Sequence, residues 1–463
     1  MNIQDTICAI ATAQGGAIGI IRVSGPEAIS ITDRIFSPVG SSAPLAERTP
    51  YTLTFGHIKD TQGEIVDEVL VSLFRAPHSY TGEDSTEISC HGSSYILQKV
   101  MQLLIDQGCR AAGPGEYTQR AFLNGKMDLS QAEAVADLIA STSEATHRLA
   151  MNQMRGGFSR ELSKLRDQLL HLTSLMELEL DFSDHEDVEF ADRSQLQALA
   201  NQIESLISKL VNSFSTGNAI KNGIPVAIIG ETNAGKSTLL NALVGEDRAI
   251  VSDIHGTTRD IIEDTINLHG VTFRFIDTAG IRETHDTIEA LGIERSFRAL
   301  EQAQIILWVV DSTRAAEQIA ALSSHILPRC KDKQLILLLN KTDLTTSEAT
   351  IGLLGLPENT CVIPISAKQH EGIEQLQSQL IRSANLPEIR QGDVIVTNVR
   401  HYEALTRALE SIHRVQEGLS THLSGDFISQ DLRECIFHLS DIVGEVTTDE
   451  VLGNIFKHFC IGK

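Results

Sequence analysis

Positive charge is scarce in this chain of 463 residues, which has 38 lysines and arginines against 61 aspartates and glutamates and a net charge of −23. A protein that holds a nucleic-acid backbone by charge alone needs a cationic face, so this balance argues against that mode of binding. Long apolar runs are also missing, since residues 305–310 and 335–339 are far shorter than the roughly 20 residues that cross a bilayer. No basic stretch precedes an apolar segment near residue 1. We therefore expect no membrane span, no secretion signal and a cytoplasmic location.

Paired cysteines are absent as well. The seven cysteines are scattered along the chain, and no C-x-x-C pair occurs. An odd and dispersed set fits neither a disulfide framework nor a zinc site, so free thiols are expected. What the sequence does have is the composition of ordinary folded protein, with 42% apolar and 21% charged residues. Its length is that of roughly three domains.

The patterning changes three times along the chain and predicts a multidomain α/β plus α+β plus all-α protein. Residues 1–120 alternate short β-like runs with Gly, Pro and Ser, which indicates a small α+β domain. Residues 121–218 have helical periodicity, and Ser130 and Glu133 have the spacing of a capping box.

The second half of the chain begins with an α/β pattern. Residues 219–382 repeat strand, loop and helix, which predicts a parallel sheet covered on both faces. Residues 383–463 are helical again, with helices expected at 399–419 and 428–452. We expect the two helical stretches to form one bundle into which the α/β domain is inserted.

The strongest motif is a G-x-x-x-x-G-K-S run at residues 230–237, placed between an apolar strand and a helix. Glycines let backbone N–H groups close around phosphate oxygens. Lys236 would bridge the β- and γ-phosphates, and the Ser237 hydroxyl would ligate magnesium. The predicted phosphate-binding residues are Gly230, Asn233, Ala234, Gly235, Lys236, Ser237 and Thr238.

Three further motifs follow predicted strands of the same region, and they are Asp277-Thr278-Ala279-Gly280, Asn340-Lys341-Thr342-Asp343 and Ser366-Ala367-Lys368. The carboxylate of Asp343 can accept hydrogen bonds from N1–H and the 2-amino group of guanine, whereas adenine offers neither donor. Ligands bind at the carboxyl ends of strands in such sheets, so the motifs together predict a GTP site in a P-loop (Ras-like) GTPase domain.

A switch segment is predicted between the P-loop helix and the Asp277 strand. There Thr257 and Thr258 could approach the nucleotide, with the Thr258 hydroxyl on magnesium when the γ-phosphate is present. The residue after Gly280 is Ile281, which cannot orient a water molecule. Another residue must therefore position the attacking water.

With these motifs in place, the sequence resembles the MnmE (TrmE) family of tRNA-modification GTPases over essentially its whole length. The family-like segments outside the GTPase motifs are Asp5-Thr6-Ile7, residues 18–25, Tyr80-Thr81-Gly82-Glu83-Asp84, Pro114-Gly115-Glu116, residues 120–126 and the terminal Cys460-Ile461-Gly462-Lys463. The terminal segment is the most specific of them.

The resemblance implies a function and a set of partners. It implies that the N-terminal domain binds a tetrahydrofolate derivative (5-formyl or 5,10-methylene) and forms a homodimer. It further implies a heterotetramer with the FAD-containing partner MnmG (GidA). Together the two proteins would install a carboxymethylaminomethyl-type group at C5 of the wobble uridine of certain tRNAs.

The resemblance also assigns residues. Folate contacts fall on Arg22, Glu87, Lys126 and Lys463. A potassium ion in place of an arginine finger would be held by Asn233, Ser252, Ile254 and Thr257, and Glu289 would orient the water. Cys460 is a reactive thiol, a packing residue or both. The sequence departs from the family pattern at Thr232 and Ser93, which leaves the shapes of the P-loop and of the one-carbon pocket open.

Two other functions share the GTPase motifs and stay open at this point. One is a GTP-driven ribosome assembly factor whose N-terminal domain docks on RNA. The other is an interaction switch whose partner carries all the modification chemistry. An assembly factor should not bind folate, whereas a folate-dependent enzyme should. An interaction switch should support tRNA modification without the terminal Cys460-Ile461-Gly462-Lys463, whereas the enzyme should need it.

Overall fold

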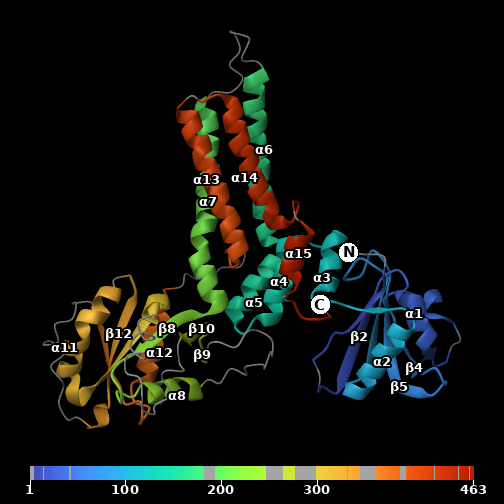
Figure 1. Cartoon of the computed structure of the whole chain (residues 1–463), viewed down its shortest axis with the longest axis horizontal. Helices are drawn as coiled ribbons and strands as arrows, with labels where there is room; N and C mark the ends of the chain where they lie inside the picture. Colours follow the sequence, from blue (N-terminus) through green and yellow to red (C-terminus); the bar gives the residue numbers. More distant parts are fainter. Residues whose placement is uncertain are drawn as a thin grey trace. The chain divides into compact units, whose positions relative to one another are not determined.

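The computed structural model in Figure 1 describes most of the chain. The described residues are 5–13, 15–40, 43–181, 193–246, 264–276, 299–330, 332–344, 360–385, 393–421, 423–446, 448–457 and 459–462. Two compact units are found, one made of residues 1–140, 151–206 and 404–463 and the other of residues 141–150 and 207–403. The predicted combination of α+β, helical and α/β parts is confirmed. The predicted boundaries at residues 120, 218 and 382 stay a prediction.

The first unit begins with a seven-stranded sheet of order β3-β4-β5-β6-β2-β1-β7. Its strands are β1 (Ile7–Ile10), β2 (Ile18–Ser24), β3 (Phe36–Pro38), β4 (Leu53–Lys59), β5 (Ile65–Phe74), β6 (Ser85–His91) and β7 (Arg110–Ala111). Neighbouring strands are antiparallel except β1 and β7. The helices α1 (Ala28–Ile35) and α2 (Ser94–Asp106) cover one face, where alternate apolar residues such as Ile21, Val71 and Ile88 are buried.

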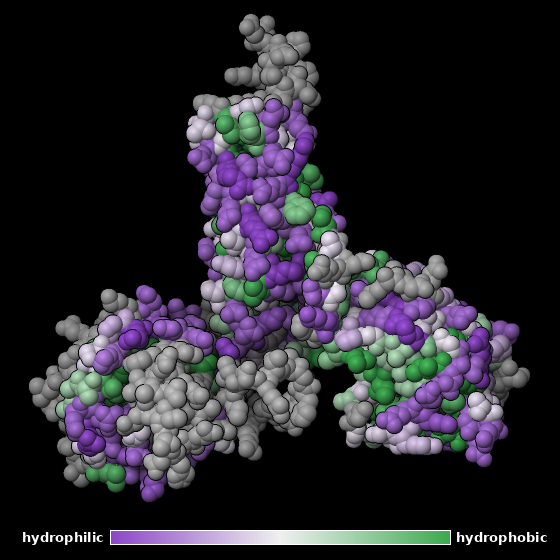
Figure 2. Space-filling model, in the orientation of Figure 1, coloured by the Kyte–Doolittle hydropathy of each residue, from purple (hydrophilic) through white to green (hydrophobic). Residues whose placement is uncertain are grey.

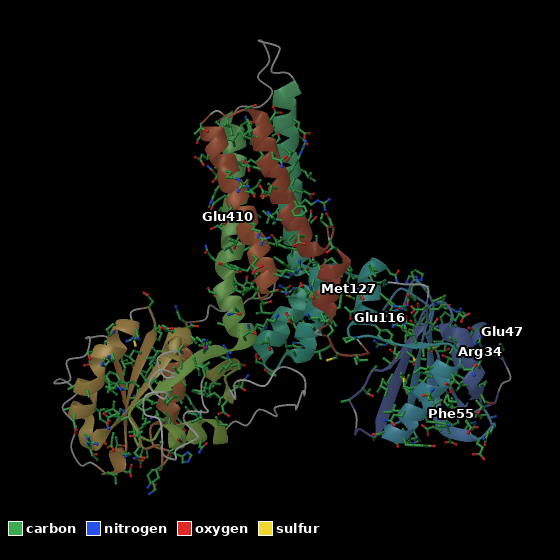
Figure 3. All side chains as sticks on the ribbon, viewed as in Figure 1. Arg34, Glu47, Phe55, Glu116, Met127 and Glu410 are labelled. Atoms are coloured by element: carbon green, nitrogen blue, oxygen red, sulfur yellow. The ribbon has the colours of Figure 1, made fainter. Side chains whose placement is uncertain are left out.

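The opposite face of this sheet carries polar and exposed apolar residues. Arg22 is paired with Glu87 across β2 and β6, and the same row continues to Ser72 and Leu53. Because directly opposed residues point to the same face, these four side chains share one surface. Phe55, labelled in Figure 3, belongs to the neighbouring row. Apolar surface is visible over this sheet domain in Figure 2.

The helix α3 (Glu116–Leu123) covers the β1 end of this second face. Tyr117 of α3 packs with Ile7 and Ala9 of β1 in a small buried cluster. Ala9 is the partner of Arg22 across β1 and β2, so Arg22 lies at the border between the covered and the uncovered parts of the face.

Long helices complete the first unit and extend into the second. They are α4 (Leu129–Ala140), α5 (Glu144–Met154), α6 (Gly157–Asp181), α7 (Arg193–Asn222), α13 (Val399–Ser420), α14 (Gly425–Val443) and α15 (Asp449–Phe456). α6 and α14 lie side by side in Figure 1. Leu162, Leu169 and Met176, which recur every seven residues along α6, are buried. No helix in the described part of the chain is long and apolar enough to cross a membrane.

Two helical predictions were wrong. The capping box of α4 is formed by Asp128 and Gln131, whose side chains accept hydrogen bonds from each other's backbone N–H at 2.9 and 3.0 Å. Ser130 donates its hydroxyl to the carboxylate of Asp128, two residues earlier, and Asp128 is the residue that caps the helix. The continuous helix expected at 428–452 is interrupted, since Gly444 caps the end of α14 and α15 begins at Asp449.

The second unit contains a six-stranded sheet of order β13-β12-β11-β8-β10-β9. The strands are β8 (Ile224–Ile229), β9 (Asp264–Leu268), β10 (Val271–Ile276), β11 (Ile305–Asp311), β12 (Gln334–Asn340) and β13 (Cys361–Pro364), and the helices are α8 (Lys236–Glu246), α11 (Ala315–Ile326) and α12 (Ile373–Ala384). Short 3-10 turns occur at Leu45–Glu47 in the first unit and at Ser312–Arg314, Leu327–Cys330 and Thr342–Leu344 in the second. The predicted parallel sheet is confirmed except for β9, which pairs with β10 in the antiparallel direction. Two apolar clusters fill its two faces.

Candidate functional site

The P-loop connects β8, which is buried, to the first turn of α8. β8 ends at Ile229 and α8 begins at Lys236, so residues 230–235 lie before a helix N-terminus, where unpaired backbone N–H groups favour phosphate. A Cβ added at Gly235 would lie 2.1 Å from Nδ2 of Asn340. Glycine is therefore required here by the close approach of the base-recognition loop. Ser237 and Thr238 follow in the first turn of α8.

Lys236 is held over this loop by main-chain carbonyls. Its Nζ donates hydrogen bonds to the carbonyl oxygens of Gly230 at 2.7 Å and of Glu231 at 2.8 Å. Burial lowers the pKa of the Lys236 ammonium, and the nearby Glu231 partly offsets this. The side chain is thus fixed beside the amides that would bind phosphate.

The predicted base-recognition residues meet at the carboxyl ends of β12 and β13. Asn340 donates from Nδ2 to the carbonyl of Ala234 at 2.8 Å, and its Oδ1 accepts the N–H of Ala367 at 3.0 Å. The hydroxyl of Ser366 donates to Oδ1 of Asp343 at 2.7 Å. One asparagine therefore joins the P-loop to both guanine motifs, and the Asp343 carboxylate is oriented by a serine. Lys368 is exposed in the turn that follows Ala367.

A second connection between the same loops was missed by the sequence analysis. Gln318, which is buried in α11, donates from Nε2 to Oε2 of Glu231 at 2.9 Å and accepts the N–H of Asp311 at 2.8 Å. Asp311 in turn pairs with Lys341 at 2.6 Å. Burial opposes ionisation of Asp311, but hydrogen bonds from Lys341 and Thr313 outweigh it and lower the pKa. Asp311 could have been found because it ends an apolar strand, whereas nothing in the sequence marks Gln318.

Several predicted site residues lie outside the described residues, so their roles stay predictions. They are Ser252, Ile254, Thr257, Thr258, Asp277, Thr278, Ala279, Gly280, Glu289 and Lys463. Of the predicted magnesium ligands the structure describes Ser237, and of the predicted potassium ligands it describes Asn233, which has a φ of 64°. Among the described residues, no cluster of three or more His, Cys, Asp or Glu side chains could hold a metal ion.

In the first unit, the guanidinium of Arg22 is held by Glu87 and by two tyrosine rings. It donates from Nε to Oε1 of Glu87 at 2.9 Å and forms an ion pair with the same oxygen at 2.8 Å. Its Cζ lies 5.4 Å from the ring centre of Tyr80 and 5.5 Å from that of Tyr117. These aromatic faces attract the cation and hold its orientation.

The end of the chain also reaches Arg22. The carbonyl of Gly462 accepts a hydrogen bond from Arg22 at 3.3 Å, and Ile461 forms a β-bridge with Pro114. A Cβ added at Gly462 would lie 2.6 Å from the carbonyl oxygen of Ile10, so this segment fits against β1 only with glycine at that position. The carbonyl of Cys460 accepts the N–H of Gly115 at 3.3 Å, while its side chain is exposed.

Lys126, the remaining described residue of the predicted folate set, lies at the edge of this region. Its Nζ donates to the carbonyl of Pro77 at 2.9 Å, and its aliphatic part borders Gly82. The structure thus brings Arg22, Glu87 and Gly462 into direct contact. It connects Lys126 to them through the segment of residues 77–85, which carries Tyr80.

A parallel sheet with a P-loop and two guanine motifs at the ends of its strands defines a P-loop GTPase. Residues 6–126 match a family profile described as GTP-binding protein TrmE N-terminus, and residues 129–460 match one described as MnmE helical domain. The tRNA modification GTPases MnmE of Bacteroides thetaiotaomicron and Bacteroides fragilis are each 70% identical over 465 residues, covering 99% of this chain and 100% of theirs. That of Flavobacterium johnsoniae is 51% identical over 466 residues, covering 99% of both chains. This chain belongs to the MnmE family of tRNA modification GTPases.

Proposed function

We propose that this GTPase, together with the FAD-containing partner MnmG, installs a carboxymethylaminomethyl-type group at C5 of wobble uridine in certain tRNAs. The one-carbon donor is a tetrahydrofolate derivative bound to the N-terminal domain. The observation that carries the proposal is the convergence of Arg22, Glu87 and the terminal segment at Gly462 on one side of the sheet. These residues are far apart in the sequence, and the strand pairing of β2 with β6 brings Arg22 and Glu87 together.

The described residues fit a folate. A fixed guanidinium suits the glutamate carboxylates of the ligand, and a carboxylate suits the donor edge of the pterin. Arg22 and Glu87 supply this pair in a partly buried position, with side chains 17% and 26% exposed. Lys126 and Lys463 would add further positive charge, and Cys460 lies next to the segment that contacts Arg22. Bound tetrahydrofolate supplies the activated one-carbon unit.

GTP hydrolysis is assigned to the residues of the second unit. Lys236 and the P-loop amides would bind the phosphates, Ser237 and Thr258 would hold magnesium, and Asp343 would select guanine. Glu289 would orient the attacking water. Asn233 and Thr257, with carbonyls near Ser252 and Ile254, would hold a potassium ion, which offsets the charge that develops on the phosphates.

The sheet face beside Arg22 supports the proposed homodimer. Leu53 and Phe55 are 65% and 47% exposed there, and Leu70 is exposed opposite Phe55. Contiguous exposed apolar residues next to a functional site are typical of an interface. A heterotetramer would then consist of this homodimer and two copies of MnmG.

The folate assignment is tested by calorimetric titration of the full chain with 5-formyltetrahydrofolate. Arg22→Ala should weaken binding by at least about thirtyfold, because it removes the guanidinium that would pair with the carboxylates of the ligand. Arg34→Ala is the matched control, since Arg34 is an exposed arginine of α1 whose guanidinium donates a hydrogen bond to the carbonyl of Gln107. Unchanged affinity in Arg22→Ala would contradict the assignment, and absence of any binding would favour an assembly factor.

Arg22→Ala and Arg34→Ala also test, in cells, whether the protein acts in wobble-uridine modification. Cells that lack the gene should lose a wobble-uridine modification in a nucleoside analysis of their tRNA. Arg34→Ala should restore it, and Arg22→Ala should not. A chain without Cys460 to Lys463 should also fail, whereas full modification by that truncated chain would favour the pure interaction switch. An intact nucleoside profile in cells without the gene would refute the proposed pathway.

The potassium site is tested by GTP turnover in potassium and in sodium chloride at equal ionic strength. We expect turnover at least about tenfold faster in potassium, because a fixed cation stabilises the transition state more than the ground state. Asn233→Ala should remove most of this difference. Equal rates in the two salts for the unmodified chain would refute the assignment.

A further inference from the structure

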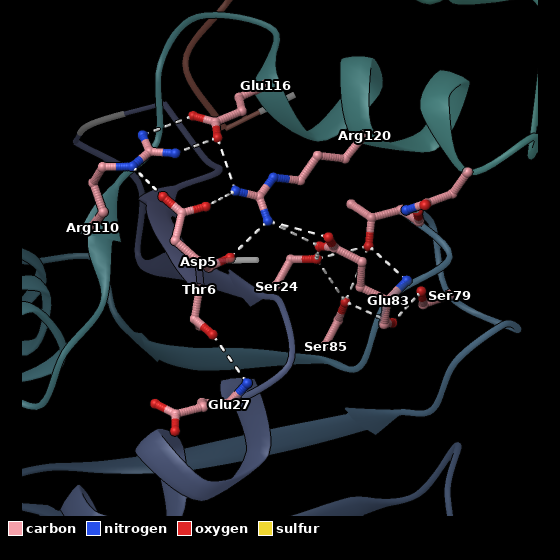
Figure 4. Close-up of polar contacts among 12 residues, drawn as sticks. Asp5, Thr6, Ser24, Glu27, Ser79, Glu83, Ser85, Arg110, Glu116 and Arg120 are labelled. Carbon is pink, nitrogen blue, oxygen red and sulfur yellow. Dashed lines mark hydrogen bonds and ion pairs between the residues drawn. The ribbon is translucent and has the colours of Figure 1, made fainter. Parts of the chain in front are cut away.

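A buried ionic cluster lies next to the proposed folate site (Figure 4). At its centre is Arg120 of α3, whose side chain is 4% exposed. Its guanidinium contacts three carboxylates, those of Asp5 at 2.5 Å, Glu116 at 3.0 Å and Glu83 at 3.1 Å. Arg110 completes the cluster by pairing with Asp5 and Glu116. Two cations thus hold three carboxylates, and Arg120 is the cation that holds Glu83.

Glu83 differs from the other two carboxylates because it fixes an irregular segment of the chain. Its Oε2 accepts a hydrogen bond from the hydroxyl of Ser24 at 2.7 Å. Its main-chain carbonyl accepts the hydroxyls of Ser79 at 2.5 Å and Ser85 at 3.3 Å. The segment of residues 79–85 is therefore folded around Glu83 and attached to the end of β2, the strand that also carries Arg22.

The same segment presents Tyr80 to Arg22. The Tyr80 ring lies 5.4 Å from the guanidinium carbon, and its hydroxyl forms a 2.8 Å hydrogen bond with Thr118 of α3. Asn124, which caps the end of α3, donates to the carbonyl of Thr81 at 2.8 Å, so α3 and its cap hold both Tyr80 and the residue after it. A continuous set of contacts runs from Arg120 through Glu83 to Tyr80 and Arg22.

We propose that Glu83, anchored by Arg120, is a positioning residue of the folate site. It fixes the 79–85 segment so that Tyr80 packs on Arg22 and holds the guanidinium ready for an anionic ligand. This inference rests on the proposed folate function. A guanidinium fixed in advance loses less conformational freedom when it binds, so the ligand is bound more tightly without any contact from Glu83 itself.

The first test is the affinity of the full chain for 5-formyltetrahydrofolate. Glu83→Gln keeps the size of the side chain and removes its charge, and we expect about fivefold weaker binding, as for residues that share one network. Arg110→Gln is the matched control, because it removes a charge from the same cluster without touching the 79–85 segment. It should lower the stability of the domain and leave the affinity unchanged. Hydrogen exchange of amides in residues 5–120 should show that the N-terminal domain of both variants is folded.

The second test asks whether Glu83 acts through Tyr80. In a Tyr80→Ala chain the ring is absent, so adding Glu83→Gln should cause no further loss of affinity. A fivefold loss of affinity on adding Glu83→Gln to the Tyr80→Ala chain, or an equal loss in Arg110→Gln, would overturn the positioning role.

The result for Arg22→Ala separates the two proposals. If Arg22→Ala binds normally the folate assignment fails, and if it binds poorly while Glu83→Gln binds normally only the positioning role fails.

Discussion

Replacing Asp343 with asparagine is expected to change the base preference of the GTP site from guanine to xanthine. Ser366 holds one oxygen of the carboxylate at 2.7 Å, so the side chain has a fixed direction. An asparagine amide there has an oxygen that can accept from N1–H of guanine, but its NH₂ group then faces the 2-amino group, and two donors cannot hydrogen-bond to each other. Sites built on such hydrogen bonds reject a ligand that cannot make them by about 10⁴-fold. Xanthine carries a carbonyl in place of the 2-amino group and can accept from the amide.

The measurement is the dissociation constant of fluorescent GDP and of the matching xanthosine diphosphate. Glu317→Gln is the control, because Glu317 is an exposed carboxylate of α11 that pairs with Arg314. It should keep the preference for guanine. Tight GDP binding by Asp343→Asn would show that Asp343 does not contact the base.

Replacing Arg120 with alanine is expected to destabilise the N-terminal domain by about 3–5 kcal/mol, the usual cost of removing one partner of a buried ion pair. Asp5, Glu83 and Glu116 would remain near one another with only Arg110 to compensate. Because the chain has several parts, the change should be measured by hydrogen exchange of amides in residues 5–120 of the full chain. Arg34→Ala, which removes an exposed arginine, should change protection by less than about 1 kcal/mol.

The effect of Arg120→Ala should also depend on pH. Burial opposes ionisation of Asp5 and Glu116, but hydrogen bonds from Arg110 and Arg120 outweigh it, so both pKa values lie below their ordinary range. A lowered pKa contributes stability above the unfolded value of about 4, and that stability is lost as the pH falls through the folded value. The difference in unfolding free energy of the N-terminal domain between Arg120→Ala and the unmodified chain should therefore become smaller below about pH 4. A stability difference that stays constant from pH 7 to pH 3 would show that Arg120 does not stabilise the domain through its ion pairs.

The sequence predicted the GTP site better than the N-terminal site for a physical reason. In a parallel sheet the carboxyl ends of strands meet at one edge, so the positions of Asn340 and Ser366 after apolar runs were enough to bring them together. Arg22 and Glu87 meet only through the pairing of β2 with β6, and no local pattern sets that register. A joint role for them in folate binding was predicted only from family resemblance. Gln318 was missed because a buried glutamine in an amphipathic helix looks like any polar residue.

The helical errors have an equally local cause. Ser130 and Glu133 fit the capping pattern, yet Asp128 and Gln131 fit it too and lie where the chain turns out of α3. Spacing alone cannot choose between two overlapping boxes. The choice is made by burial, since Leu129 and Ala132 pack with Leu452 and Phe456 and so fix where α4 begins.

The contact between Arg22 and Gly462 joins residues 440 positions apart. A ribosome releases the N-terminal sheet long before it makes residues 460–463, and domains generally fold in that order. The sheet must therefore fold with one side of its site unfinished, and a nascent or prematurely ended chain lacks the segment that completes it. The proposed folate site is in this way complete only in chains that carry the segment of residues 460–462.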